Sequence, residues 1–141
     1  MTAFPEIGAV LVCDDVRKEV SNKDILIGVY AADILVPTFP AWVNIAVWLE
    51  VIPKETGSLE MSVRLSIDGK PAVIVIGLQM NSLSPVGVAL PGVQVLAEKE
   101  SEILVEVKEG DNWRVLKRKK VIKGVFKLPL SGPAASATGT S

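Results

Sequence analysis

Apolar and polar residues alternate with a period of two along much of the chain. Over residues 42–51 the odd positions from Val43 to Val51 are apolar, and the even positions include Asn44 and Glu50. Residues 59–67 repeat this alternation. The pattern indicates strands that bury one face, and their polar opposite faces favour an antiparallel sheet with water on one side. The i, i+3, i+4 spacing of an amphipathic helix does not extend over a useful length.

Turn residues separate the predicted strands at short intervals. Asp68-Gly69 is a strong hairpin signal between two apolar runs. Asn22 tolerates the left-handed conformation and precedes a strand over residues 25–30. Gly110 lies in the turn before residues 113–122. Short strands with turns of this kind are typical of all-β domains.

The fold class that follows is all-β. We predict an antiparallel β-sandwich of roughly eight to ten strands, with a small β-barrel as the alternative. Residues 83–92, which contain Pro85 and Pro91, are expected to be irregular. One domain is expected over residues 1–130. Residues 131–141 carry no charge and are mostly small, which predicts a flexible tail.

The composition excludes several kinds of chemistry. The chain of 141 residues has no His and one Cys. Triads that use imidazole as the base, and zinc sites built from Cys and His, are therefore excluded. The apolar runs are too short to span a membrane as a helix. No Lys or Arg precedes the apolar stretch 7–13, so a signal peptide is not expected. An unpaired Cys13 fits a reducing compartment, and we expect a cytoplasmic protein.

The N-terminal half resembles a known group of proteins. The features that carry the resemblance are a strand with Cys13-Asp14, a hairpin that ends in Lys23, the strand Ile27-Gly28-Val29-Tyr30 and the corner Phe39-Pro40. Over about residues 10–80 they resemble a family of small, uncharacterised bacterial all-β proteins. The resemblance implies a sandwich-type domain and carries no activity, cofactor or partner with it. Asn22 stands where this family's hairpin would have a glycine.

Charge is segregated toward the C-terminal end. Every charged residue from Arg114 to Lys127 is basic, whereas residues 98–111 are mainly acidic. A basic strand could contact an anionic partner, such as an acidic protein or nucleic acid. Alternatively, Lys blunts a sheet edge, or acidic residues on the neighbouring strand, Glu102, Glu106 and Glu109, neutralise the patch. The candidate contacts are Arg114, Lys117, Arg118, Lys119, Lys120 and Lys123.

Acidic and aromatic side chains supply the other candidates. Carboxylates gathered at one end of a sandwich could hold a divalent metal or act as acid and base. Whether they converge depends on the topology; they are Asp14, Asp15, Asp24, Asp33, Asp68 and Asp111. Trp48 is predicted on the face opposite the apolar row of its strand and therefore needs a cover, either within the chain or from a partner. Phe39 and Trp42 precede it, and these three residues form the candidate interface.

The sequence favours a non-enzymatic binding or structural module. The expected partner is a protein, either a second copy of the chain or another protein, and neither a membrane nor a cofactor is expected. No catalytic, cofactor-binding or metal-binding residue is assigned. An enzyme that uses carboxylates or a divalent metal on a small substrate is one alternative. Nucleic-acid binding through residues 114–127 is another, disfavoured by the formal net charge of −1.

Overall fold

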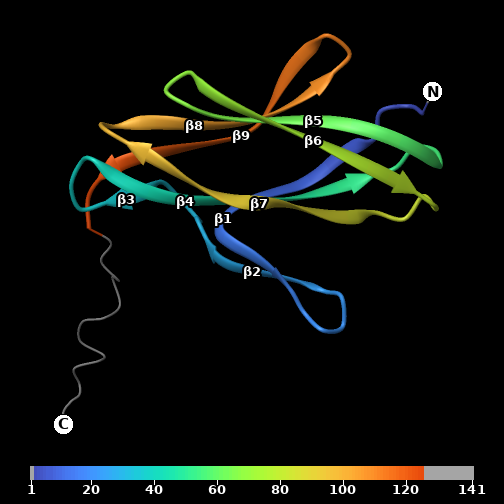
Figure 1. Ribbon diagram of the computed structural model, residues 1–141, viewed down its shortest axis with the longest axis horizontal. Coiled ribbons are helices and arrows are strands. Elements are labelled where there is room, and N and C mark those ends of the chain that lie inside the picture. The colour runs from blue at the N-terminus through green and yellow to red at the C-terminus, as the bar shows by residue number, and fades with distance from the viewer. Residues whose placement is uncertain (1, 126–141) are drawn as a thin grey trace.

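The computed structural model of the protein describes residues 2–125 and shows two β-sheets packed face to face (Figure 1). Within this part of the chain there are nine strands and no helix, which confirms the predicted all-β class and strand number. No helix here is long and apolar enough to cross a membrane. The predicted tail, residues 131–141, lies outside the described residues.

The two sheets interleave strands from the whole chain. The four-stranded sheet has the order β2 (Asp24–Val29), β1 (Glu6–Lys18), β4 (Ala41–Ile52) and β7 (Val86–Ala97). The five-stranded sheet has the order β3 (Ile34–Val36), β9 (Asn112–Lys123), β8 (Ser101–Glu109), β5 (Gly57–Ile67) and β6 (Lys70–Met80). All neighbouring strands are antiparallel except β3 and β9, which are parallel.

The core lies between the sheets and uses the alternation that the sequence shows. The odd-numbered positions of β4 from Val43 to Val51 are all buried. They belong to one core cluster with the inward side chains of β5 and β8, which are Met61, Val63, Leu65, Ile67, Ile103, Val105 and Val107. A shift of one residue in the pairing of any of these strands would turn its buried side chains outward, so burial fixes the register.

Several turns have the predicted geometry. Asn22 adopts a φ of 70°, and Asp68 and Gly69 adopt φ of 50° and 75°, which fits a two-residue type I′ hairpin. The peptide bond between Phe39 and Pro40 is cis, and the chain passes there from β3 in one sheet to β4 in the other. The corner expected at this dipeptide is therefore present.

The prediction for residues 83–92 was wrong beyond its first few residues. Strand β7 begins at Val86 and continues through Pro91 to Ala97. The register against β4 shifts between Leu90 and Val93, which marks a bulge. Proline is tolerated here because β7 is an edge strand whose outer N–H groups need no ladder partner.

Candidate functional site

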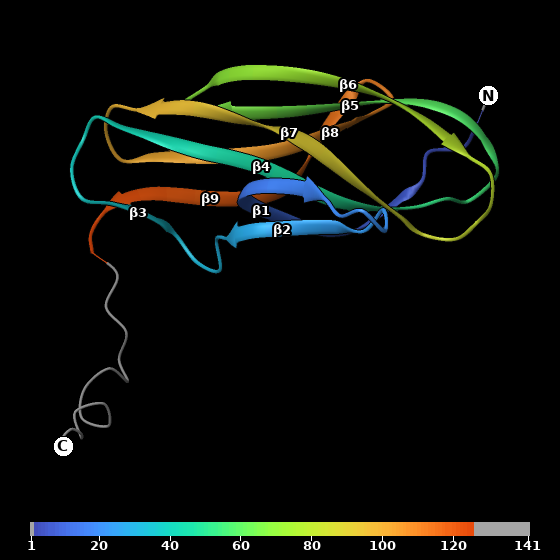
Figure 2. The same cartoon turned by 60° about the horizontal axis from the view of Figure 1, so that its bottom comes forward.

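The β1–β2 hairpin borders a polar region of the surface. Strand β1 pairs with β4 only as far as Cys13 and Ala46, and then continues as a two-stranded ribbon with β2 (Figure 2). At the far end of this ribbon, the Asp24 carboxylate accepts a hydrogen bond of 2.9 Å from the indole Nε1 of Trp48. The ribbon therefore reaches back to the outer face of the four-stranded sheet.

The hydrogen bond to Asp24 is part of what covers Trp48. The indole also lies directly against Gly87 on β7, where an added Cβ would collide with the ring. Asp24 in turn accepts a hydrogen bond of 2.8 Å from Lys18. The hydrogen bonds from Lys18 and then from Trp48 lower the pKa of the Asp24 carboxyl below its usual value. Trp48 is thus on the predicted outer face and is partly covered from within the chain.

A second polar cluster ties the end of β2 to β1 and β4. The Tyr30 hydroxyl donates to Asp14 Oδ1 at 2.5 Å and lies 2.9 Å from the backbone carbonyl oxygen of Asn44. Burial, together with the Asp14 carboxylate, raises the pKa of the Tyr30 hydroxyl. Gly28 has a φ of 66°, and a Cβ at this position would overlap the Asp14 side chain. The glycine therefore allows this carboxylate to lie close against β2.

Beside this cluster lies a polar hollow of about 380 Å³. It is lined by Asp14, Asp15, Arg17, Asn44, Gly92, Val93 and Gln94. Asp15 accepts from Arg17 at 3.0 Å, and Gln94 donates to Asn44 at 3.0 Å. Because these groups hydrogen-bond one another, the hollow is held in shape by its own lining.

The predicted carboxylate site does not assemble as a whole. Asp14 and Asp15 share the hollow, whereas Asp24 is held by Lys18 and Trp48. Asp68 accepts from Ser101. Asp33 is exposed just before β3, and Asp111 lies in the β8–β9 turn. Over residues 2–125 no three His, Cys, Asp or Glu side chains come together in a group that could hold a metal ion.

Three of the six basic residues of β9 have partners among the described residues. Arg118 pairs with Glu102 at 3.1 Å, and Arg114 approaches Glu109 at 3.8 Å. Lys119 donates to the backbone carbonyl oxygens of Tyr30 and Ala32, at 2.6 and 3.2 Å. Lys117 is half-buried, whereas Lys120 and Lys123 are exposed. These partners hold the chain together around β9 and reduce the positive charge available to an anionic ligand.

Glu106 has a partner that differs from the expected one. Its carboxylate accepts two hydrogen bonds from Arg64 on β5, at 2.9 and 3.1 Å. The same guanidinium lies 4.2 Å from the ring centroid of Trp113 on β9. Glu106 is buried, and the Arg64 guanidinium gives its carboxylate the hydrogen-bonding partner that a buried polar group requires. The arrangement connects β5, β8 and β9 across the outer face of their sheet.

The three candidate interface residues have different environments. Phe39 is partly buried against the core, and Trp48 is partly covered as described above. Trp42 is 66% exposed on the outer face of β4 and lies directly across from Leu96 on β7, which is also exposed. We call the surface formed by Trp42 and Leu96, with the amide pair Asn44 and Gln94 beside it, the Trp42 face.

Two further rows of exposed aliphatic side chains were not predicted from the sequence. Ile25, Ile27 and Val29 are exposed on β2, and Val73 and Val75 are exposed on β6. The period-two pattern shows that such residues share a face of their strand. It does not show that the strand lies at a sheet edge, because strand order depends on pairing between distant segments.

Comparisons with known proteins give no relative on which to base a function. No family model matches the chain, and neither a curated protein nor a solved structure matches it. The resemblance suggested by the N-terminal half therefore stays an expectation.

Proposed function

We propose that this protein is a non-enzymatic interaction module that binds another protein through the Trp42 face. The observation that carries the proposal is the exposed indole of Trp42 beside Leu96, near the end of the sheet where the start of β4 pairs with the end of β7. Trp is the side chain most enriched among residues that dominate binding energy at protein interfaces. A ring that leaves most of its apolar surface exposed within the fold supports a contact outside it.

The surroundings of the indole favour a protein over an anionic polymer. Two residues along the same pair of strands lie the amides of Asn44 and Gln94, which carry no charge and already bond each other. An apolar centre with a polar rim resembles the core and rim of protein interfaces. Nucleic-acid binding would instead need free cations, and on β9 the side chains of Arg114, Arg118 and Lys119 already have partners.

A comparison of two single substitutions tests the proposal. Trp42→Ser removes the indole from an exposed position and should leave the fold intact. Leu83→Ser is the matched control, because Leu83 is 59% exposed and lies in the β6–β7 connection, outside the Trp42 face. Each tagged protein is used to capture partners from cell lysate at low and high salt, with circular dichroism to confirm folding.

The expected result is a protein partner that the wild type and Leu83→Ser retain at high salt and that Trp42→Ser loses. Truncation of a central interface Trp costs about 2 kcal/mol or more, equivalent to at least a thirtyfold loss of affinity. Equal capture by all three proteins would contradict the proposal. Capture of nucleic acid alone, released by salt, would instead support the alternative based on β9.

A further inference from the structure

The edges of the two sheets differ in how well they are protected against pairing with another strand. Unpaired N–H and C=O groups along an edge are a template for a further strand, and proteins usually block them. Strand β3 is three residues long, and β2 has six residues with a positive-φ glycine, Gly28. Strand β7 is interrupted by the bulge beside Pro91. The part of β9 that β3 leaves uncovered carries Arg and Lys.

Strand β6 has none of these protections over most of its length. It forms the outer margin of the five-stranded sheet, as Figure 2 shows, and pairs with β5 without a register shift along eleven residues. Its only charged residue, Lys70, and its only proline, Pro71, are its first two residues. Val73 and Val75 are 53% and 60% exposed on the outer face of the sheet. This edge is therefore long, regular, uncharged and apolar.

The hairpin fixes which backbone groups of β6 are free. Ile67 and Lys70 close a two-residue turn, and in such a hairpin this pair exchanges both of its backbone hydrogen bonds. Hydrogen-bonded and non-hydrogen-bonded pairs then alternate along an antiparallel ladder. The even-numbered residues of β6 thus bond to β5, and the odd-numbered residues direct N–H and C=O toward the open edge. The two exposed valines belong to this odd-numbered set.

We propose that two copies of the chain associate by antiparallel pairing of β6 with β6 about a two-fold axis at Val75, which joins their five-stranded sheets into one. The axis lies at the middle of the strand, so the whole length of β6 is used on both sides. In this register Val75 faces its own copy, and each Val73 faces Gly77 of the other chain. All of these residues have free backbone groups, so the ladder bonds are reciprocal.

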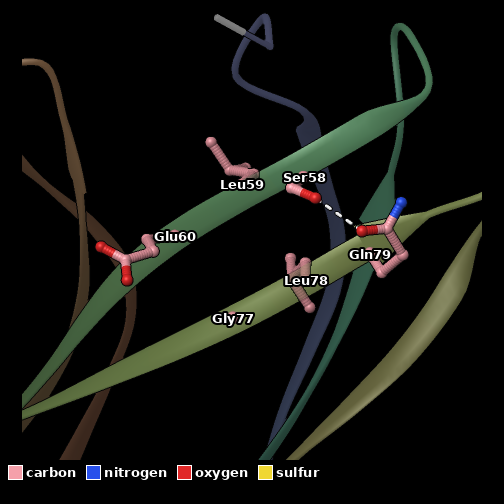
Figure 3. Close-up of a pocket in the computed structure, with 6 residues that line it drawn as sticks. All are labelled: Ser58, Leu59, Glu60, Gly77, Leu78 and Gln79. Carbon is pink, nitrogen blue, oxygen red and sulfur yellow. Dashed lines mark hydrogen bonds between the residues drawn. The ribbon is translucent and has the colours of Figure 1, made fainter.

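The surface around Gly77 supports this register. A shallow hollow of about 370 Å³ lies there, lined by Ser58, Leu59, Glu60, Gly77, Leu78 and Gln79. Figure 3 shows Gly77 on β6 without a side chain, next to Leu78, with Glu60 on the neighbouring strand β5. A Cβ placed at Gly77 would meet no atom within 4 Å. The side chain of Val73 from the second copy therefore has room beside Gly77, which has no side chain of its own.

The charges and the proline are compatible with a second copy as the occupant. With the axis at Val75, Lys70 of each chain faces Met80 of the other, so the two lysines lie at opposite ends of the interface. Pro71 faces Gln79, and its missing N–H removes one hydrogen bond at each end. A closed two-fold pair is also the commonest form of homo-oligomer and leaves no further β6 edge exposed.

This pairing is separate from the partner proposed for the Trp42 face. Trp42 belongs to β4 in the other sheet, and the dimer does not use it. Trp42→Ser should therefore leave the dimer unchanged. The solution mass of the protein tests the pairing and the capture experiment tests the partner, so either proposal can fail alone.

Sedimentation velocity over a range of protein concentrations is the first test. The wild type should sediment as a dimer at high concentration and dissociate on dilution. Val75→Lys places two like charges opposite each other at the axis and should remain monomeric. Val29→Lys is the matched control, because Val29 is an exposed valine on β2, an edge strand of the other sheet, and this variant should still dimerise. A wild type that is monomeric throughout, or a control that is monomeric at concentrations where the wild type is a dimer, would overturn the proposal.

Cysteine substitutions test the register itself. Facing residues of a hydrogen-bonded pair have Cα atoms about 5.5 Å apart, within the range that a disulfide spans. Val75→Cys should therefore give a covalent dimer on mild oxidation. In Val73→Cys the two new thiols lie four residues apart along the ladder, roughly 14 Å, and should not join. The native Cys13 is fully buried and does not compete. Equal cross-linking of both variants, or of neither, would contradict the assigned axis.

Discussion

The cluster of Arg64, Glu106 and Trp113 allows a quantitative test of what holds the five-stranded sheet together. Arg64 makes two hydrogen bonds to the Glu106 carboxylate and stacks on Trp113. Glu106 retains only 8% of its surface exposure. The substitution Arg64→Met keeps most of the aliphatic stem and removes the cation. We expect it to leave a poorly solvated carboxylate without its partner.

The magnitude follows from burial. Breaking a buried ion pair by removing one partner costs about 3–5 kcal/mol, whereas an exposed pair contributes about 0–1 kcal/mol. The Arg64 side chain keeps 28% exposure, so water screens part of the interaction. We therefore expect Arg64→Met to lower the free energy of unfolding by about 2–3 kcal/mol, in line with hydrogen bonds to charged groups. A separate loss of about 0.5–1 kcal/mol is expected for Trp113→Leu from the cation–π contact.

A double-mutant cycle separates this interaction from other effects of each substitution. Urea unfolding, followed by far-ultraviolet circular dichroism, gives the free energy of unfolding of the wild type, Arg64→Met, Glu106→Gln and the double variant. The predicted coupling energy is about 1.5–2.5 kcal/mol, because each single variant leaves the other partner unsatisfied. A coupling below about 0.5 kcal/mol, as for an exposed surface pair, would refute the reasoning.

Two further predictions concern the β1–β2 hairpin. Because the hydrogen bonds from Lys18 and Trp48 lower the pKa of Asp24 below its usual 3.8, this carboxylate contributes stability that is present above pH 3.8 and is lost as pH falls through its lower folded-state value. The variant Asp24→Asn should abolish that part of the acid destabilisation. In the wild type, the indole N–H signal of Trp48 in NMR spectra should report the titration of Asp24. A titration midpoint at or above pH 3.8 would contradict the lowered pKa. Gly28→Ala should destabilise the protein more than Gly110→Ala, since both glycines have positive φ but only Gly28 faces a carboxylate where the Cβ would be placed. Equal losses in urea unfolding would show that the backbone conformation alone sets the cost.

The all-β architecture could be predicted from the sequence because buried strands and tight turns each have a local sequence pattern. The period-two row of β4 identifies the core face, and Asp68-Gly69 identifies a hairpin, both without knowledge of distant contacts. The Phe39-Pro40 corner was also readable from local residue types. Strand β7 was harder to predict, because Pro91 argues against a central strand and the sequence does not reveal that β7 lies at an edge.

The candidate site was less accessible because it depends on which strands become neighbours. The outward direction of Trp48 followed from alternation, but its cover came from Asp24 and Gly87, which lie in other strands. One interpretation of the charge segregation was that acidic residues on the neighbouring strand neutralise β9, and Glu102 does pair with Arg118. Glu106 instead pairs with Arg64 of β5, since β8 lies between β5 and β9. The partner of each acidic residue depends on the order of the strands in the sheet, and the alternation of apolar and polar residues does not determine that order.

The most direct test of the proposed interaction module is site-specific photo-cross-linking in cells. A photoreactive phenylalanine analogue is introduced at position 42, and the same group at position 83, which is also an exposed apolar site, serves as the control. The account predicts a discrete covalent adduct with another protein from position 42 and none from position 83. No adduct from position 42, or the same set of adducts from both positions, would contradict it.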